Sequence, residues 1–264
     1  MSNGDIFVGE MIGTAILILF GAGVCAAVTL RFSKARAAGW VVIAFGWGFG
    51  VLAGAYTAAP LSGGHLNPAV TLGLAVDTGV WDKVWIYLLG QITGAMIGAV
   101  LCYLVYFAQF RANVRQTGTT EGTVDEPVPT LGIFSTIPEI RNPVANLITE
   151  ILATIALVLP LLALVGSNRH VEGIGIGLIP GQEGIYGSGI AILLVALLVV
   201  GIGLSLGGPT GYAINPARDL GPRIIHSVLP IQNKGTSDWG YSWIPVVGPL
   251  IGGLLGGVIY NAAF

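Results

Sequence analysis

Long runs of apolar residues, separated by shorter polar stretches, dominate the pattern along the chain. They occupy residues 6–28, 39–61, 84–108, 144–165, 187–207 and 241–263. Each run is close to the ~20 residues that a helix needs to cross the hydrocarbon core of a bilayer. The pattern therefore predicts an all-α membrane protein with six transmembrane helices. The first run follows MSNGD, which lacks a basic side chain, and it exceeds signal-peptide length, so we expect it to stay in the protein.

The composition agrees with a membrane interior as the solvent. Only 9% of the 264 residues are charged, and the net charge is −2. Soluble domains contain about 25% charged residues, so a soluble chain is excluded, and the small net charge indicates no nucleic-acid partner. Cys25 and Cys102 lie in different apolar runs, which favours small core residues over a disulfide or a metal site. No cofactor and no catalytic group is predicted.

The two halves of the chain repeat one another in the same order. GEMIGTAILILFGAG near residue 9 matches TEILATIALVLPLLALVG near residue 149, which aligns Glu10 with Glu150. Each half, 1–108 and 144–264, contains three spans, and an odd number turns the second copy upside down in the bilayer. We therefore predict an inverted repeat within a single domain, 1–264. The polar, Pro- and Thr-rich segment 109–143 is predicted to be a solvent loop between the halves.

A further pair of matching segments carries the tripeptide Asn-Pro-Ala. The two copies are Asn67, Pro68 and Ala69, and Asn215, Pro216 and Ala217. Asn at the N-cap followed by Pro at the first helical position is a strong helix start. The first of these helices, 67–76, is ~15 Å long and reaches only the middle of a ~30 Å core. Two such half-helices, entering from opposite faces, meet at their N-termini with the two asparagines side by side.

The backbone before each half-helix is irregular and rich in glycine, as in LSGGH and GGPTGYAI. Such backbone persists at membrane depth only where it lines a water-filled path, so the repeat predicts a pore. The asparagine NH₂ groups are expected to face the lumen, and the two helix dipoles add a positive potential that opposes cations and breaks a proton wire. The predicted ladder of pore-lining carbonyls consists of Gly63, Gly64, His65, Gly211, Tyr212 and Ala213.

HLNPAVT at 65–71 and NPARDLGP at 215–222 resemble the paired motifs of the aquaporin family, and the likeness covers almost the whole chain. FSTIP at 134–138, Asp219 and Arg223 are similar to the glycerol-conducting branch, the aquaglyceroporins. The resemblance implies a homotetramer in the cell membrane, with one passive pore per subunit for glycerol, water and small neutral solutes. It also implies cytoplasmic termini, whereas the Lys and Arg residues between the spans favour the opposite orientation by the positive-inside rule.

The resemblance assigns the selectivity filter to Trp47, Gly203, Tyr212 and Arg218. The two aromatic faces suit the carbon backbone of a polyol, while Arg218 and nearby carbonyls hydrogen-bond its hydroxyls. Gly203 is expected to leave room that a histidine fills in water-selective relatives. Tyr212 departs from the phenylalanine that is common at its position, which changes the expected width and polarity of the filter.

Glu10, Glu150 and Asp219 are assigned supporting roles. The symmetry of the two glutamates favours acceptors for the loop N–H groups before each half-helix, with a proton relay as the alternative. His65 is expected at the pore mouth, and His170 and His226 in solvent or at the interface. Glycines at four-residue spacing predict close helix packing: Gly90, Gly94, Gly98, Gly248, Gly252 and Gly256.

Three functions remain open from the residues alone. The first is a glycerol channel, and the second is a channel mainly for water, urea, hydrogen peroxide, dihydroxyacetone or undissociated lactic acid. The third is an ion-coupled transporter with broken helices at its binding site, for which the two symmetric glutamates are the candidate coupling groups. An enzyme is least expected, because no nucleophile, base and orienting group come together in the motifs.

Overall fold

Helices make up most of the computed structural model, which describes residues 1–113, 115–119, 122–126, 129–165 and 190–264. The first half contains α1 (Asn3–Thr29), α2 (Trp40–Ser62), α3 (Pro68–Thr78) and α4 (Val84–Val105). The connecting segment contains α5 (Phe107–Ala112), β1 (Arg115–Thr119), β2 (Gly122–Glu126) and α6 (Leu131–Phe134). The second half contains α7 (Pro143–Val165), α8 (Ile190–Leu206), α9 (Pro216–Val228) and α10 (Ile244–Ala263).

Five of the described helices are long and apolar enough to cross a membrane: α1, α2, α4, α7 and α10. The sixth predicted span corresponds to α8, a shorter apolar helix of 17 residues. Its predicted first residues, 187–189, lie outside the described part of the chain. The hydropathy pattern therefore located the spans correctly, because side chains that face lipid and side chains that face the bundle are both apolar here.

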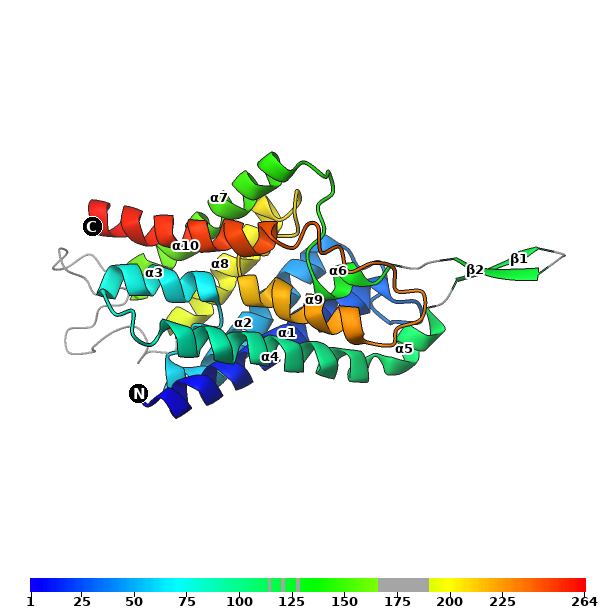
Figure 1. Ribbon diagram of the computed structural model, residues 1–264, viewed down its shortest axis with the longest axis horizontal. Coiled ribbons are helices and arrows are strands. Elements are labelled where there is room, and N and C mark those ends of the chain that lie inside the picture. The colour runs from blue at the N-terminus through cyan, green and yellow to red at the C-terminus, as the bar shows by residue number, and fades with distance from the viewer. Residues whose placement is uncertain (114, 120–121, 127–128, 166–189) are drawn as a thin grey trace.

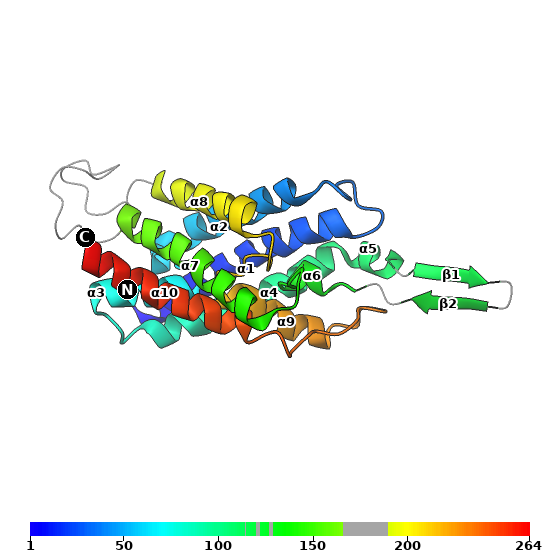
Figure 2. The ribbon, with the colours of Figure 1, turned by 90° about the horizontal axis from the view of Figure 1, so that it is seen from above.

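The spanning helices run along the long axis of the molecule (Figure 1). Both termini lie at one end of this axis, and the β1–β2 hairpin projects from the other end in both ribbon views (Figures 1 and 2). Termini on one side are what an even number of spans requires.

The two short helices α3 and α9 begin at the Asn-Pro-Ala motifs and follow one another along the long axis (Figure 1). Asn67 and Asn215 are the N-cap residues, and a proline follows each of them at the first helical position. The side-chain oxygen of Asn67 accepts from the N–H of Ala69, and that of Asn215 accepts from the N–H of Ala217. Both half-helices thus begin where the capping pattern predicted.

Glycine stripes bring the helices of each half into close contact, as predicted. A β-carbon at Gly94 of α4 would stand 2.2 Å from the carbonyl oxygen of Met11 in α1. In the second half, a β-carbon at Gly252 of α10 would stand 2.6 Å from the carbonyl oxygen of Ile151 in α7. Only glycine allows these backbones to approach so closely, so the same packing recurs in α1 with α4 and in α7 with α10.

The connecting segment is more ordered than the solvent loop that its composition predicted. β1 and β2 pair as an antiparallel hairpin in which Arg115 stands opposite Glu126. The second part of the segment returns to the helical body, where α6 contacts both α1 and α9. Ile133 and Phe134 of α6 are buried in the main hydrophobic core. The composition did not indicate these elements, because Thr-rich sequence also forms strands and because α6 is recruited by tertiary packing.

Candidate permeation pathway

An internal cavity of about 90 Å³ lies along the line where the two half-helices meet. Both N-cap asparagines line it, together with three of the four predicted filter residues, Trp47, Tyr212 and Arg218. Five of the six predicted backbone positions line it as well, and a larger part of its wall is apolar. The backbone positions are Gly63, Gly64, His65, Tyr212 and Ala213, and the apolar wall includes Leu17, Val51, Leu157, Leu161, Val195 and Val199.

The two buried glutamates hold the irregular backbone on either side of the asparagines. Glu10 accepts from the N–H groups of His65 and Leu66 at 2.9 and 2.7 Å, and from the Ser62 hydroxyl at 2.6 Å. Its partner in the other half makes the same three contacts: Glu150 accepts from the N–H groups of Ala213 and Ile214 at 2.9 and 3.0 Å and from the Thr210 hydroxyl at 2.7 Å. This arrangement matches the expectation of structural acceptors.

These carboxylates stabilise backbone that would otherwise be unfavourable. Leu66, Tyr212 and Ile214 have φ values of 53°, 39° and 44°. A residue other than glycine in the left-handed region costs about 1–2 kcal/mol. The hydrogen bonds to Glu10 and Glu150 offset this cost and fix which way the intervening carbonyls point.

The two asparagines form hydrogen bonds between the two halves of the chain. The Asn67 side-chain NH₂ donates to the carbonyl of Ile214 at 2.8 Å, and the Asn215 NH₂ donates to the carbonyl of Leu66 at 2.8 Å. One N–H of each amide is therefore used across the interface between the half-helices. The sequence predicted that the whole NH₂ group of each asparagine faces the lumen. The structure corrects this prediction, because one N–H of each amide is already bonded and only the second N–H is left for the lumen.

Three of the predicted filter residues line the same cavity as the two asparagines: Trp47 of α2, Tyr212 of the loop before α9, and Arg218 of α9. The Arg218 guanidinium lies over the Trp47 ring, with Cζ 3.9 Å from the ring centroid. Arg218 is 7% exposed and Tyr212 is 3% exposed. Neither Arg218 Nη1 nor Tyr212 Oη has a hydrogen-bond partner within the described residues. Buried polar groups are almost always paired, so two unpaired atoms on residues that line the cavity need an explanation.

Gly203, the fourth predicted filter residue, lies directly against Tyr212. A β-carbon at Gly203 would stand 2.8 Å from Cζ and 2.9 Å from Oη of Tyr212. The space that glycine leaves is therefore filled by the phenol of Tyr212. The Trp40 indole donates to the Gly203 carbonyl at 2.7 Å and meets the Tyr212 ring edge-on at 5.8 Å. Gly211 likewise lies behind Tyr212, in contact with Thr136.

A second cavity, of about 580 Å³, lies at the end of the molecule that holds the N-terminus and shares Gly63 and His65 with the first. The His65 ring stacks on Tyr87 with centroids 4.1 Å apart, and His65 Nδ1 is 3.1 Å from the Thr71 hydroxyl. His65 thus stands between the two cavities. This position is compatible with the pore mouth that the sequence predicted for His65.

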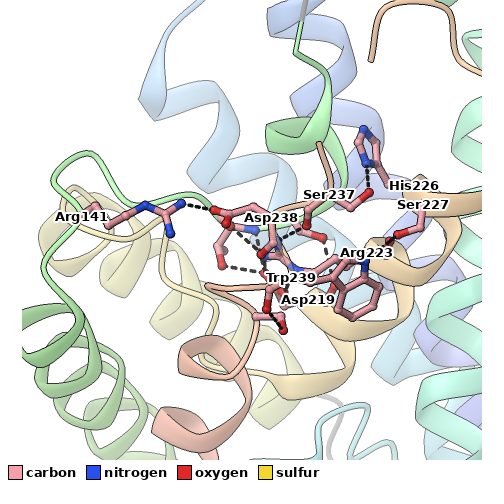
Figure 3. A network of polar contacts seen from close by, with 11 residues as sticks. Arg141, Asp219, Arg223, His226, Ser227, Ser237, Asp238 and Trp239 are labelled. Atoms are coloured by element: carbon pink, nitrogen blue, oxygen red, sulfur yellow. Dashed lines mark hydrogen bonds and ion pairs between the residues drawn. The ribbon is translucent and has the colours of Figure 1, made fainter. Parts of the chain in front are cut away.

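A cluster of buried charged and polar side chains lies along α9, and sequence reasoning misplaced one of them. His226 is fully buried, neither in solvent nor at the interface as predicted, and its two ring nitrogens lie 3.1 Å from the Thr130 hydroxyl and 2.9 Å from the Ser237 hydroxyl. Arg223 pairs with Asp219 at 2.8 Å, and both side chains are fully buried (Figure 3). The predicted position of His170 lies outside the described residues.

Two half-helices that meet inside a bundle of spanning helices, around a buried cavity with unpaired donors, define a multi-pass membrane channel. The chain belongs to the major intrinsic protein family, whose model matches residues 2–260.

Curated relatives and a solved structure agree with this assignment. The chain is 48% identical over 259 residues to the glycerol uptake facilitator protein of Bacillus subtilis (strain 168), covering 98% of this chain and 84% of that protein. It is 44% identical to the probable glycerol uptake facilitator protein of Thermotoga maritima, covering 98% of this chain and 100% of that protein. The aquaglyceroporin structure from Plasmodium falciparum is similar with a TM-score of 0.74 and 26% identity, covering 99% of this chain and 97% of that one.

Proposed function

We propose that the chain is a passive channel for glycerol and other small neutral solutes, that it also conducts water, and that it excludes protons and ions. The observation that carries the proposal is the two-sided filter. Arg218 Nη1 and Tyr212 Oη are buried without partners beside the apolar faces of Trp47 and Tyr212. Glycerol has the matching two sides, because its hydroxyls lie along a chain of carbon atoms.

The roles of the filter residues follow from their chemistry. Arg218 only donates, so it binds solute oxygens, whereas the Tyr212 hydroxyl both donates and accepts. The Trp47 ring is covered by the guanidinium, which leaves its edge and the ring of Tyr212 as the apolar wall. A polyol satisfies all of these groups at once, while a single water molecule satisfies them one at a time.

Charge exclusion is assigned to the same short stretch of the lumen. Arg218 contributes a fixed positive charge, and the N-termini of α3 and α9 add the positive ends of two helix dipoles. The remaining N–H groups of Asn67 and Asn215 orient a passing oxygen as an acceptor, which interrupts the chain of donors and acceptors that proton transfer requires.

We also propose that four copies form a homotetramer with one pore in each subunit. The resemblance to aquaporins supports this assembly. Chemical cross-linking in the membrane is expected to give species up to the tetramer. A series that stops at the dimer would contradict the proposal.

Stopped-flow light scattering on proteoliposomes tests the solute. Water and glycerol permeabilities are measured with the same vesicles, with empty liposomes as the control. Glycerol flux is expected to increase in proportion to its gradient and to be independent of sodium and of a pH gradient. Saturation at low glycerol combined with dependence on sodium or pH would support the ion-coupled transporter instead, and water flux without glycerol flux would make the chain a water channel.

A further inference from the structure

Thr136 is a buried residue of the segment that connects the two halves, and its side chain lies near the chain neighbours of two candidate filter residues: Asp219, which follows Arg218, and Gly211, which precedes Tyr212. The threonine is 3% exposed and lies two residues after α6. Its neighbourhood is fixed by the backbone as well, because the N–H of Glu139 donates to the carbonyl of Pro209 at 3.0 Å. The connecting segment therefore lies against the residues that lead into the second half-helix.

The hydroxyl of Thr136 is bound on the α9 side. Its Oγ1 donates to Asp219 Oδ2 at 2.6 Å, and its backbone N–H donates to the same oxygen at 2.7 Å. Asp219 directly follows Arg218, whose guanidinium lines the cavity. The position of the Thr136 hydroxyl is thus linked to the first turn of α9 through one carboxylate.

A buried arginine fixes that carboxylate in turn. Arg223 donates to both oxygens of Asp219, to the Thr136 carbonyl at 3.0 Å and to the Ser237 carbonyl at 2.8 Å (Figure 3). Each of these hydrogen bonds has the charged Arg223 guanidinium as its donor, which strengthens it. A buried ion pair whose hydrogen-bonding groups are satisfied is held rigidly. Asp219 is therefore a rigid acceptor and not a mobile one.

The methyl group of Thr136 is packed on the other part of the filter. Thr136 Cγ2 stands 3.3 Å from the place that a β-carbon would take at Gly211. Gly211 has a φ of 84° and directly precedes Tyr212, a residue that lines the cavity and whose hydroxyl has no partner among the described residues. The methyl group limits how far the backbone at Gly211 can shift toward Thr136.

We propose that Thr136 is a positioning residue of the filter, which sets the separation between the Tyr212 segment and the Arg218 end of α9 and thereby the preference for glycerol over water. The Thr136 hydroxyl bonds to Asp219 and the Thr136 methyl group lies near Gly211. A β-branched side chain has few rotamers, so it holds both groups in place. The inference rests on the proposed glycerol channel. It adds to that function a residue that influences solute preference without contacting the solute.

A small error in this separation affects the two solutes differently. Glycerol meets Arg218 and the ring of Tyr212 at the same time, so a displaced wall weakens two contacts together. Water meets these groups one at a time and is less sensitive to their spacing. A change in the ratio of glycerol to water permeability therefore reports on positioning, whereas a loss of folded channels lowers both permeabilities and leaves the ratio unchanged.

Two variants separate the two ends of the side chain. Thr136→Val keeps the methyl contact with Gly211 and removes the hydroxyl that donates to Asp219. Thr136→Ser keeps the hydroxyl and removes the methyl group. Thr149→Val is the matched control, since the Thr149 hydroxyl donates to the Ala145 carbonyl of its own helix and lies far from the filter in sequence.

The experiment measures glycerol and water permeability of each variant in the same proteoliposomes. Thr136→Val is expected to lower the glycerol-to-water ratio by about threefold or more, the effect of one changed hydrogen bond, and Thr136→Ser to lower it by a smaller factor. Thr149→Val is expected to keep the ratio of the unmodified chain. An unchanged ratio in both Thr136 variants, or an equal change in Thr149→Val, would overturn the inference. An unmodified chain that conducts no glycerol would instead overturn the proposed function.

Discussion

Gly203 of α8 and Tyr212 of the second loop fit against each other so closely that a β-carbon on the glycine would stand 2.8 Å from Cζ of the tyrosine. The Tyr212 ring also meets Trp40 edge-on, and Trp40 donates to the Gly203 carbonyl. We therefore expect a larger residue at position 203 to push Tyr212 toward the lumen and to narrow the pore.

Gly203→Ala is accordingly expected to lower glycerol permeability. The added methyl group pushes the phenol of Tyr212 toward Arg218, and a barrier higher by ~1.4 kcal/mol corresponds to about tenfold slower passage. Water permeability, measured in the same vesicles, is expected to fall much less, because a water molecule needs less width. Gly201→Ala on the same helix is the control, since a β-carbon there meets nothing within 4 Å. Full glycerol flux in Gly203→Ala would show that the ring is free to move elsewhere.

The hydroxyl of Tyr212 is expected to bind solutes during passage. Tyr212→Phe keeps the ring and its contact with Trp40 but removes the unpartnered Oη, so glycerol permeability is expected to fall by about fivefold, the equivalent of one hydrogen bond of ~1 kcal/mol. Water permeability is expected to stay within about twofold. Tyr241→Phe serves as the control, because the Tyr241 hydroxyl bonds to Asn146 and not to the cavity. Equal glycerol flux in Tyr212→Phe and the unmodified chain would contradict this role.

The parts of the fold that sequence could predict are those that depend on short-range patterns. The spans follow from hydropathy, and the starts of α3 and α9 follow from Asn67 and Asn215, whose side chains cap the helices within three residues. The close packing of α4 and α10 could also be predicted, because glycine recurs at four-residue spacing along the face of each helix that contacts its neighbour.

The contacts that sequence could not predict join residues far apart in the chain. Thr136 and Asp219 are 83 residues apart, and His226 lies 96 residues from Thr130. No local signal marks a threonine in a loop as the partner of a buried carboxylate. The contact between Gly203 and Tyr212 has the same character, because nothing in the spacing of α8 shows that the ring of Tyr212 occupies the space beside the glycine.

Glu150→Gln is expected to destabilise the protein. The Glu150 side chain is fully buried and accepts from the Thr210 hydroxyl and from two backbone N–H groups. An amide replaces one accepting oxygen with a donor that faces other donors, which costs about 1–3 kcal/mol. The midpoint of thermal unfolding in detergent is expected to fall, and Glu139→Gln, at an exposed residue, is expected to leave it unchanged. An equal midpoint for Glu150→Gln would mean that the carboxylate does not hold the loop.

Arg218→Val is expected to admit protons or small cations. The guanidinium is the charged group that the cavity lining contains, and it lies beside the unpartnered Tyr212 hydroxyl at the predicted narrowest part. Valine removes the positive charge and widens the lumen at once, so that water can form a continuous chain toward Asn215. The helix dipoles of α3 and α9 remain, so a partial leak is expected and not a fully open pore.

The measurement for Arg218→Val is proton flux into proteoliposomes that contain a pH-sensitive dye, driven by a potassium diffusion potential. The variant is expected to acidify the vesicles faster than the unmodified chain, while glycerol permeability falls because the donors to its hydroxyls are gone. Arg111→Val removes an exposed arginine of α5 and is expected to behave like the unmodified chain. Proton flux in Arg218→Val at the level of Arg111→Val would assign charge exclusion to the two half-helices alone, because Asn67, Asn215 and their helix termini are the positive groups that remain at the centre of the pathway.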